Sequence, residues 1–169
     1  MTKGQIACHI ACLATAVLVD LDADLRSDTR SVWPLVEALA SSVGASVRWM
    51  RDPTRGGVAT VLNELARDTG WSVAIGEDRV PVRDEVRGAC ELLGLDPLHI
   101  ANEGQFVAIV APEAADAAVH ALRSFPGGEQ AAIVGEIRAD RSSTVTVESS
   151  YGGSRIVDIL VGDPLPRIC

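Results

Sequence analysis

Hydrophobic positions repeat with two different periods along the chain, and these periods predict a domain built from both helices and strands. Apolar residues three or four positions apart, as in an amphipathic helix, occur in four segments: 31–43, 58–69, 84–93 and 112–124. Apolar and polar residues alternate, as in a half-buried strand, in four others: 15–25, 133–137, 144–148 and 155–160. Short apolar runs typical of strands occupy 47–50, 71–75, 98–101 and 106–110.

Glycine, proline and serine mark the ends of the predicted helices. Ser31 is the expected N-cap of the first helix, with Pro34 in its first turn, where the missing N–H costs little. Gly44, Gly70 and Gly94 are the expected stops of the first three helices.

Tight reversals between neighbouring strands determine the expected sheet. The turn 102–105 is expected to join strands 98–101 and 106–110, and the polar turn 139–143 to join strands 133–137 and 144–148. Val80–Val82 contains a proline and is expected at a sheet edge. Four helices interleaved with six or more strands, several joined by tight reversals, predict an α+β fold with helices on a mixed or antiparallel sheet.

One loop between a predicted strand and a predicted helix has the composition of an anion site. It has the sequence Arg-Asp-Pro-Thr-Arg-Gly-Gly over 51–57. A helix N-terminus presents free N–H groups, paired glycines let a phosphate approach the main chain, and Arg51 and Arg55 add positive charge. The Gly-Lys-Ser/Thr element of a P-loop is missing, and Asp-Pro is also a common start for any helix. A purely structural role therefore stays open.

Glu103 and His99, in the region predicted as strand, turn and strand, can each be interpreted as either structural or functional. Glu103 lies on the turn 102–105, where it is either a solvated carboxylate or, beside a reactive group, a general base. His99 lies in an apolar stretch and is interpreted as a satisfied core or edge histidine.

The C-terminal tail Gly162–Cys169 ends in a thiol that no later residue covers. Pro164 and Pro166 keep the tail extended, so its eight residues reach on the order of 25 Å. Arg167 favours the thiolate, the reactive form, while the terminal carboxylate disfavours it. Cys169 is thus a candidate nucleophile, and a frayed terminus that happens to end in cysteine is the alternative.

Composition excludes several classes of protein. A chain of 169 residues with 47% hydrophobic content and a mean hydropathy of +0.20 suits one folded domain. The net charge of -8 and a pI near 4.8 exclude a nucleic-acid partner. Four scattered cysteines predict reduced thiols in the cytoplasm and no metal site. The apolar stretch 6–19 is too short to span a membrane.

Four motifs occur in a characteristic order, and together they resemble the hydrogenase maturation factor family HypE. They are Arg51–Gly57, Asn102–Gly104, Gly152–Arg155 and Pro166–Cys169. The resemblance runs from about Leu25 to the end. It corresponds to the family's C-terminal domain, shared with the aminoimidazole ribonucleotide synthetase (PurM-like) superfamily. It implies a three-layer α/β/α fold with a mixed, largely antiparallel sheet.

The resemblance also implies a reaction. In that family the carbamoyltransferase HypF carbamoylates the terminal cysteine, and the protein uses ATP, with Mg, to dehydrate the product to a thiocyanate. The cyanide then passes to the iron of a [NiFe] hydrogenase through HypC and HypD. Cys169 would carry the group and Glu103 would be the base. Five residues would lie near the phosphates, namely Asp52, Thr54, Arg55, Gly56 and Gly57, and four would position the tail, namely Gly152, Gly153, Pro166 and Arg167.

The chain departs from the family in three ways. We expect no counterpart in this sequence of the family's N-terminal domain, which binds ATP and forms the dimer. Residues 1–24 are expected to be atypical of the family, and Gln105 stands where a lysine is expected. We expect three parts: an atypical segment 1–24, the PurM-like domain 25–160 and a flexible tail 161–169. The isolated chain should hydrolyse little or no ATP. A homodimer stays open, as does a non-catalytic module that docks the transferase or the iron scaffold.

Overall fold

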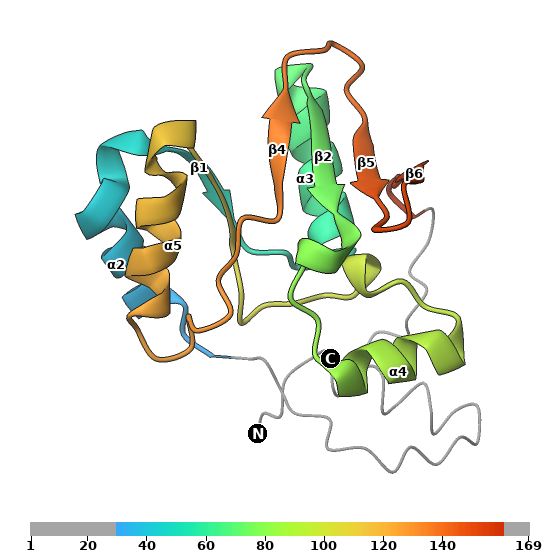
Figure 1. The fold of residues 1–169 in the computed structure, drawn as a ribbon, viewed down its shortest axis with the longest axis horizontal. Coiled ribbons are helices and arrows are strands. Elements are labelled where there is room, and N and C mark those ends of the chain that lie inside the picture. Colours follow the sequence, from blue (N-terminus) through green and yellow to red (C-terminus); the bar gives the residue numbers. More distant parts are fainter. Residues whose placement is uncertain (1–29, 161–169) are drawn as a thin grey trace.

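The structure is a computed structural model that describes residues 30–160 (Figure 1). Its helices are α2 (Trp33–Val43), α3 (Gly57–Thr69), α4 (Asp84–Leu93) and α5 (Ala115–Arg123). Its strands are β1 (Val47–Arg51), β2 (Ser72–Gly76), β3 (Val107–Val110), β4 (Gly135–Arg138), β5 (Val145–Glu148) and β6 (Ser154–Ile156). Short 3-10 helices are η1 (Gly44–Ser46), η2 (Glu77–Arg79), η3 (Pro97–His99) and η4 (Pro112–Ala114). The four predicted helices are confirmed, while the strand predicted for 15–25 and the tail 161–169 lie outside the described residues.

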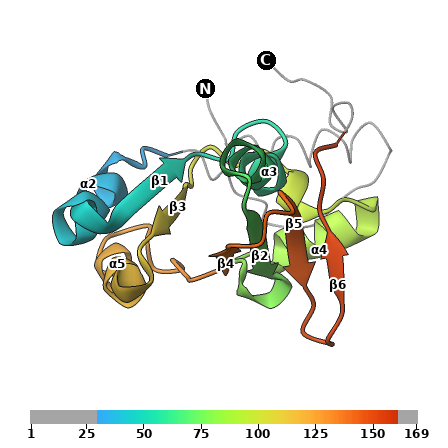
Figure 2. The same ribbon diagram turned by 90° about the horizontal axis from the view of Figure 1, so that it is seen from above.

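The described strands form two sheets (Figure 2). In the smaller sheet β1 pairs antiparallel with β3, and in the larger one the strand order is β4-β2-β5-β6. Strand β2 is antiparallel to β4 and parallel to β5, and β6 is antiparallel to β5. The predicted α+β fold with a mixed, largely antiparallel sheet is therefore confirmed.

Both predicted hairpins are wrong, because the strands pair with partners distant in sequence. Strand β3 pairs with β1, and β2 lies between β4 and β5 and separates them. The strand predicted for 98–101 is replaced by η3. Asp96 caps this turn by accepting the N–H of Leu98 at 3.0 Å, and Pro97 occupies the first position. Val80–Val82 forms no strand.

The helix ends are close to the predicted positions, with one correction at the start of α2. Its N-cap is Val32 rather than Ser31, and the Ser31 hydroxyl instead accepts the N–H of Trp33 at 3.4 Å. Gly70 and Gly94 end α3 and α4 in the left-handed conformation that glycine adopts without steric cost.

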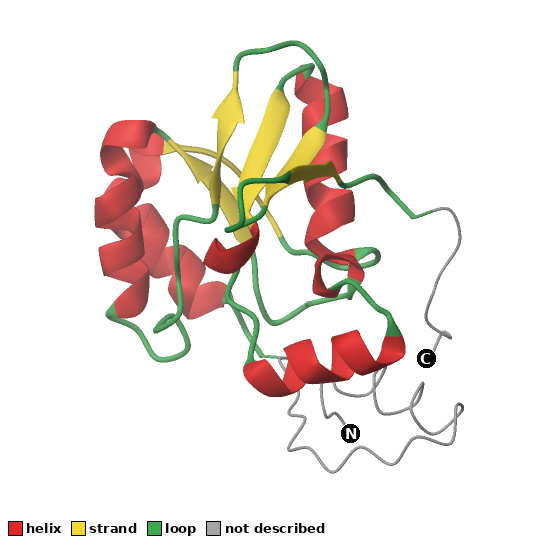
Figure 3. Cartoon of the chain, turned by 45° about the vertical axis from the view of Figure 1, so that its right-hand side comes forward, coloured by secondary structure: helices red, strands yellow, loops and turns green. Residues whose placement is uncertain are grey.

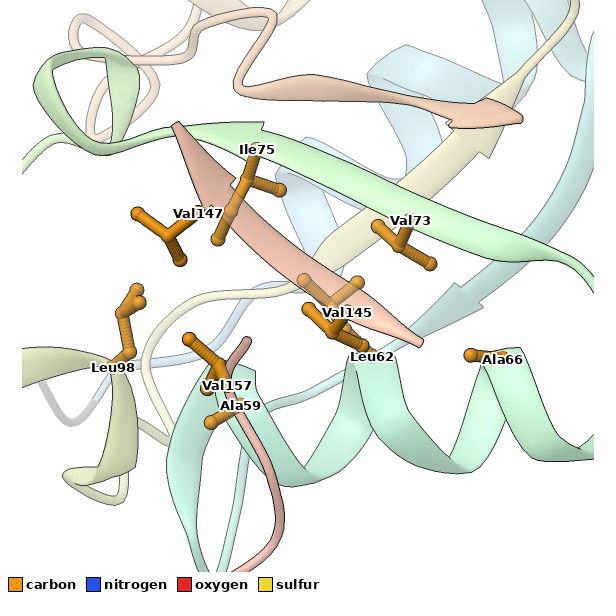
Figure 4. Packing of buried hydrophobic residues seen from close by; sticks show 9 residues of the cluster. All are labelled: Ala59, Leu62, Ala66, Val73, Ile75, Leu98, Val145, Val147 and Val157. Carbon is orange, nitrogen blue, oxygen red and sulfur yellow. The ribbon is translucent and has the colours of Figure 1, made fainter. Parts of the chain in front are cut away.

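The main core lies between α3 and the larger sheet (Figure 4). Helix α3 contributes Ala59, Leu62 and Ala66 to this core. The facing side chains come from β2, β5, η3 and the segment after β6: Val73, Ile75, Val145, Val147, Leu98 and Val157. Burying each valine, leucine or isoleucine contributes about 1.5–3 kcal/mol, so α3 is held firmly against the strands.

Helix α3 runs alongside the larger sheet, while α4 lies across one end of the fold (Figure 3). Helices α2 and α5 pack on each other beside the smaller sheet. Within residues 30–160 no helix combines the length and the apolar character needed to cross a lipid bilayer.

Candidate functional site

Two of the sequence motifs meet at the N-terminus of α3. The backbone N–H of Asn102 donates to the carbonyl oxygen of Pro53 at 2.8 Å. Gly57 lies directly against the main chain that leads to Asn102, because a Cβ on Gly57 would be 2.5 Å from the carbonyl oxygens of both Leu98 and Ile100. The loop 52–57 and the segment 98–104 are therefore in contact, although some 45 residues separate them in sequence.

The loop 52–57 is a tight turn fixed by its own backbone. The N–H of Thr54 donates to the carbonyl of Asp52, and the N–H of Gly57 donates to the carbonyl of Thr54, both at 3.0 Å. Gly56 and Gly57 have φ of +73° and +61°, which favours glycine. A Cβ on Gly56 would be 2.0 Å from the hydroxyl of Thr60. Packing alone thus explains both glycines.

The charges around this loop are only partly available for a ligand. Arg51 forms an ion pair with Glu64 of α3, whereas Arg55 and Asp52 are exposed. Within residues 30–160 no side chain caps the start of α3, and the N–H of Gly57 is already bonded to Thr54. The remaining N–H groups of the first turn are the donors that attract anions. This arrangement fits a phosphate group.

A large apolar hollow lies beside the loops. Its volume is about 1680 Å³, and it reaches Pro53 and Asn102 at the site. Its lining includes Trp49, Ile75, Val107, Ile109, Val134 and Ile137, which come from the strands and the segment before β4. The walls of this hollow are mostly apolar but also carry Arg79, Arg83 and Arg138. The phosphate candidate is the loop 52–57, because it combines a helix N-terminus with an exposed arginine.

Glu103 lies half-buried on a turn that Arg30 holds in place. The Nε of Arg30 donates to the carbonyl of Gly104 at 2.9 Å, and its Nη2 donates to the side-chain oxygen of Gln105 at 3.1 Å. Sequence reasoning missed Arg30, because its partners are 74 and 75 residues away. The side-chain oxygen of Asn102 is buried and has no hydrogen-bond partner within the described part of the chain.

The residues predicted to position or carry the reactive group fall in two places. Gly152 and Gly153 lie in the exposed turn between β5 and β6, where Ser149 donates its N–H to the carbonyl of Gly153 at 2.8 Å. They reverse the chain so that β6 pairs with β5. Pro166, Arg167 and Cys169 lie outside the described residues.

Cys90 of α4 is a buried cysteine whose thiol has a raised pKa. It is 1% exposed, and burial raises the pKa of its thiol to about 11, with the negative charge of Asp96 adding to the shift. Cys90 is therefore a buried thiol that stays protonated near neutral pH.

A family model describes nearly the whole chain. Residues 1–148 match the model for AIR synthase related protein, C-terminal domain. The chain belongs to this family.

Curated relatives narrow the resemblance to HypE. The chain is 46% identical over 168 residues to the carbamoyl dehydratase HypE of Rhizobium leguminosarum bv. viciae, which covers 99% of the chain and 48% of that protein. It is 45% identical to HypE of Bradyrhizobium diazoefficiens over 100% of the chain and 49% of that protein. The chain thus spans about half the length of these relatives. The resemblance drawn from the four motifs is confirmed.

Solved HypE structures share the fold. Escherichia coli HypE matches with a TM-score of 0.87 and 39% identity, covering 99% of the chain and 50% of that protein. A HypE structure in complex with ATP matches with a TM-score of 0.83 and 38% identity, over 96% of the chain and 50% of that protein. A HypE–HypF complex matches with a TM-score of 0.83 and 37% identity, over 94% and 50%.

The HypE resemblance assigns roles to residues that the structure distributes over two regions. The five phosphate candidates lie on one loop, and Glu103 follows Asn102, whose N–H binds that loop. Gly152 and Gly153 lie on a separate exposed turn. The contact between the first two motifs is the geometric basis for the proposal below.

Proposed function

We propose that this chain is the tail-bearing half of a HypE-type carbamoyl dehydratase that takes part in [NiFe] hydrogenase maturation. The contact between the loop 52–57 and the turn bearing Glu103, in a chain 46% identical to HypE over 99% of its length, carries this proposal. Two motifs that the family assigns to one reaction lie together, although the sequence separates them.

Cys169 is the nucleophile in the first step. Its thiolate attacks the carbamoyl carbon held by a HypF-type transferase, an S–C bond forms, and the carbamoyl group leaves its donor. A solved HypE–HypF complex supports such a partner. HypC and HypD are the proposed acceptors of the cyanide, and we place these steps in the cytoplasm.

Dehydration is the second step. The amide oxygen attacks the γ-phosphorus of ATP and ADP leaves, so that the oxygen becomes part of a phosphate leaving group. One N–H proton is released to water and the other is taken by a base as phosphate departs with the oxygen, which leaves a C≡N triple bond on sulfur. Glu103 takes an N–H proton, since a carboxylate within reach of that proton serves as a general base.

The loop 52–57 is the proposed phosphate end of the site. The start of α3 and the exposed Arg55 attract the negative charge, while Asp52 is a candidate ligand for Mg. A HypE structure in complex with ATP supports nucleotide use in the family. We propose that the remainder of the ATP site comes from the half of the relatives that this chain does not span.

A non-catalytic docking module is the second candidate. It is favoured by the packing that fully explains Gly56 and Gly57, and by the ion pair that engages Arg51 with Glu64. In this case the chain would bind the transferase or the iron scaffold without carrying a group on Cys169.

Intact-protein and peptide mass spectrometry distinguishes the two candidates. The chain is incubated with a HypF-type transferase, carbamoyl phosphate and ATP. We expect one added carbamoyl group on Cys169, none in Cys169→Ala, and no modification of the buried Cys90. Binding of the transferase without any adduct on Cys169 would favour the docking module and contradict the carrier role.

A further inference from the structure

The chain just before the tail is fixed by side chains from other elements. Val157 is 2% exposed, and its N–H donates to the carbonyl of Val145 at 2.9 Å. Its own carbonyl accepts a hydrogen bond from the side-chain amide of Asn63 at 2.9 Å. Asn63 is only 4% exposed and also donates to the carbonyl of Ala59 at 2.9 Å. A buried amide with two such bonds holds Val157 firmly against α3.

The next residue, Asp158, is held from two sides. Its carbonyl accepts a hydrogen bond from Nε2 of His99 at 3.0 Å, and its carboxylate lies 3.2 Å from the guanidinium of Arg67. The side chain of His99 is 12% exposed, whereas Asp158 and the bond between them are exposed to solvent. The Asp158 carboxylate also accepts the N–H of Ile159 at 2.7 Å.

A second contact ties β6 to the same region. Arg155 of β6 donates to the carboxylate of Asp96 at 2.7 Å, and the other carboxylate oxygen of Asp96 accepts the N–H of Leu98 at 3.0 Å. Asp96 also lies 3.8 Å from Nδ1 of His99. Asp96 therefore connects β6, η3 and the imidazole that holds Asp158.

The elements that hold this segment also build the candidate site. Helix α3 begins at Gly57, in the loop region of the site, and carries Asn63 about two turns further on. The turn η3 contains His99, and the carbonyl of the neighbouring Leu98 lies against Gly57. The root of the tail and the loop 52–57 thus share one rigid support. The turn at Gly152 and Gly153 is exposed and makes no comparable contact in the described structure.

We propose that Asn63 and His99 are positioning residues that fix where the tail leaves the fold, so that Cys169 is directed toward the loops 52–57 and 102–105. This inference rests on the proposed function, in which Cys169 must reach that site. With Asp158 fixed, residues 159–169 extend at most about 40 Å. A fixed root within reach raises the effective concentration of the thiol at the site, and a root that detaches lowers it.

Nitroxide labelling of the full chain measures directly how often Cys169 comes close to the loops 52–57 and 102–105. Cys8 and Cys12 are replaced by serine, Cys169 carries the label, and the buried Cys90 stays unlabelled. The label broadens backbone amide signals near it, so the broadening of the amides in the two loops reports how often the tail visits them. Spectra of the unlabelled protein show whether each variant is folded.

Four variants separate positioning from general stability. His99→Ala removes the donor to Asp158, and His99→Gln restores an N–H at a similar reach. His120→Ala is the matched control, an exposed histidine on α5. Arg155→Ala loosens the Asp96 contact from an exposed position and decides the question if His99→Ala does not fold.

We expect strong loop broadening in the parent and in His120→Ala. Broadening should fall about two- to tenfold in His99→Ala, the equilibrium factor of one net hydrogen bond, and return in His99→Gln. Unchanged broadening in folded His99→Ala and Arg155→Ala, or no loop broadening in the parent, would overturn the inference. Failure of the transferase to carbamoylate Cys169 in the parent would instead overturn the proposed function, while the labelling result still decides the positioning role.

Discussion

Gly57 and Gly70 stand at opposite ends of α3 and offer a matched test of the contact that builds the site. Both adopt the left-handed conformation, with φ of +61° and +75°. A Cβ on Gly57 would lie 2.5 Å from the carbonyl oxygens of Leu98 and Ile100, whereas a Cβ on Gly70 would meet nothing within 4 Å. Alanine therefore carries a similar backbone strain at either position, but only alanine at position 57 clashes with main-chain oxygens.

The expected losses follow from these two terms. Left-handed backbone costs a non-glycine residue about 1–2 kcal/mol, at either position. Overpacking against main-chain atoms adds about 1–3 kcal/mol, only at position 57. We expect the free energy of unfolding to fall by about 1–2 kcal/mol in Gly70→Ala and by about 2–5 kcal/mol in Gly57→Ala, out of roughly 5–15 kcal/mol for a typical domain.

Urea unfolding followed by circular dichroism measures both losses, with the slope of the transition checked for each variant. Amide chemical shifts give a second readout, since only Gly57→Ala should displace the signals of Leu98, Ile100 and Asn102. Equal losses in the two variants, with no shift changes at those residues, would refute the contact between the loop 52–57 and the segment 98–104.

Three further predictions concern single residues. Because burial raises the pKa of Cys90 from 9.0 to about 11, the folded state favours its neutral thiol. That contribution is present below pH 9 and lost as the pH rises to 11, so unfolding curves over this range should show a decline of about 2 kcal/mol that Cys90→Ala lacks. Cys169→Ala should leave the melting temperature unchanged, and a drop of many degrees would argue against a tail outside the core. Asn63→Ala should cost about 1–3 kcal/mol in urea unfolding, since the carbonyl of Val157 loses its donor, and an unchanged midpoint would contradict that bond.

The helices could be predicted because their signals are local. The apolar stripe of α3 faces the core as expected, and Gly70 ends the helix through its own backbone conformation. The same logic located α4 and its stop at Gly94. Such features depend on residues a few positions apart, which periodicity and capping report directly.

Strand partners could not be predicted in the same way. The alternating pattern located β4 and β5 but contains nothing about β2, which separates them. The apolar run at 98–101 was wrongly interpreted as a strand, because a short run of this kind does not distinguish a strand from the turn that Asp96 caps.

In the candidate site, too, the local features could be predicted from the sequence and the contacts between distant residues could not. The loop 52–57 was proposed through its glycines and arginines, and Glu103 through its turn and the family resemblance. Arg30 was missed, because its contacts with Gly104 and Gln105 join distant parts of the chain. His99 was interpreted as a satisfied histidine, which its bond to Asp158 confirms, but its place at the root of the tail needed the fold.

The most direct test of one site formed by the two loops and the tail is the ATP-dependent change in mass at a carbamoylated Cys169. The carbamoylated chain is mixed with ATP, Mg and the complementary half of a HypE protein, and Cys169 is followed by peptide mass spectrometry. We predict the loss of one water, as the carbamoyl group becomes a cyano group, and a much slower loss in Glu103→Gln. A carbamoyl group that persists in the parent, or that dehydrates equally fast in Glu103→Gln, would contradict the account.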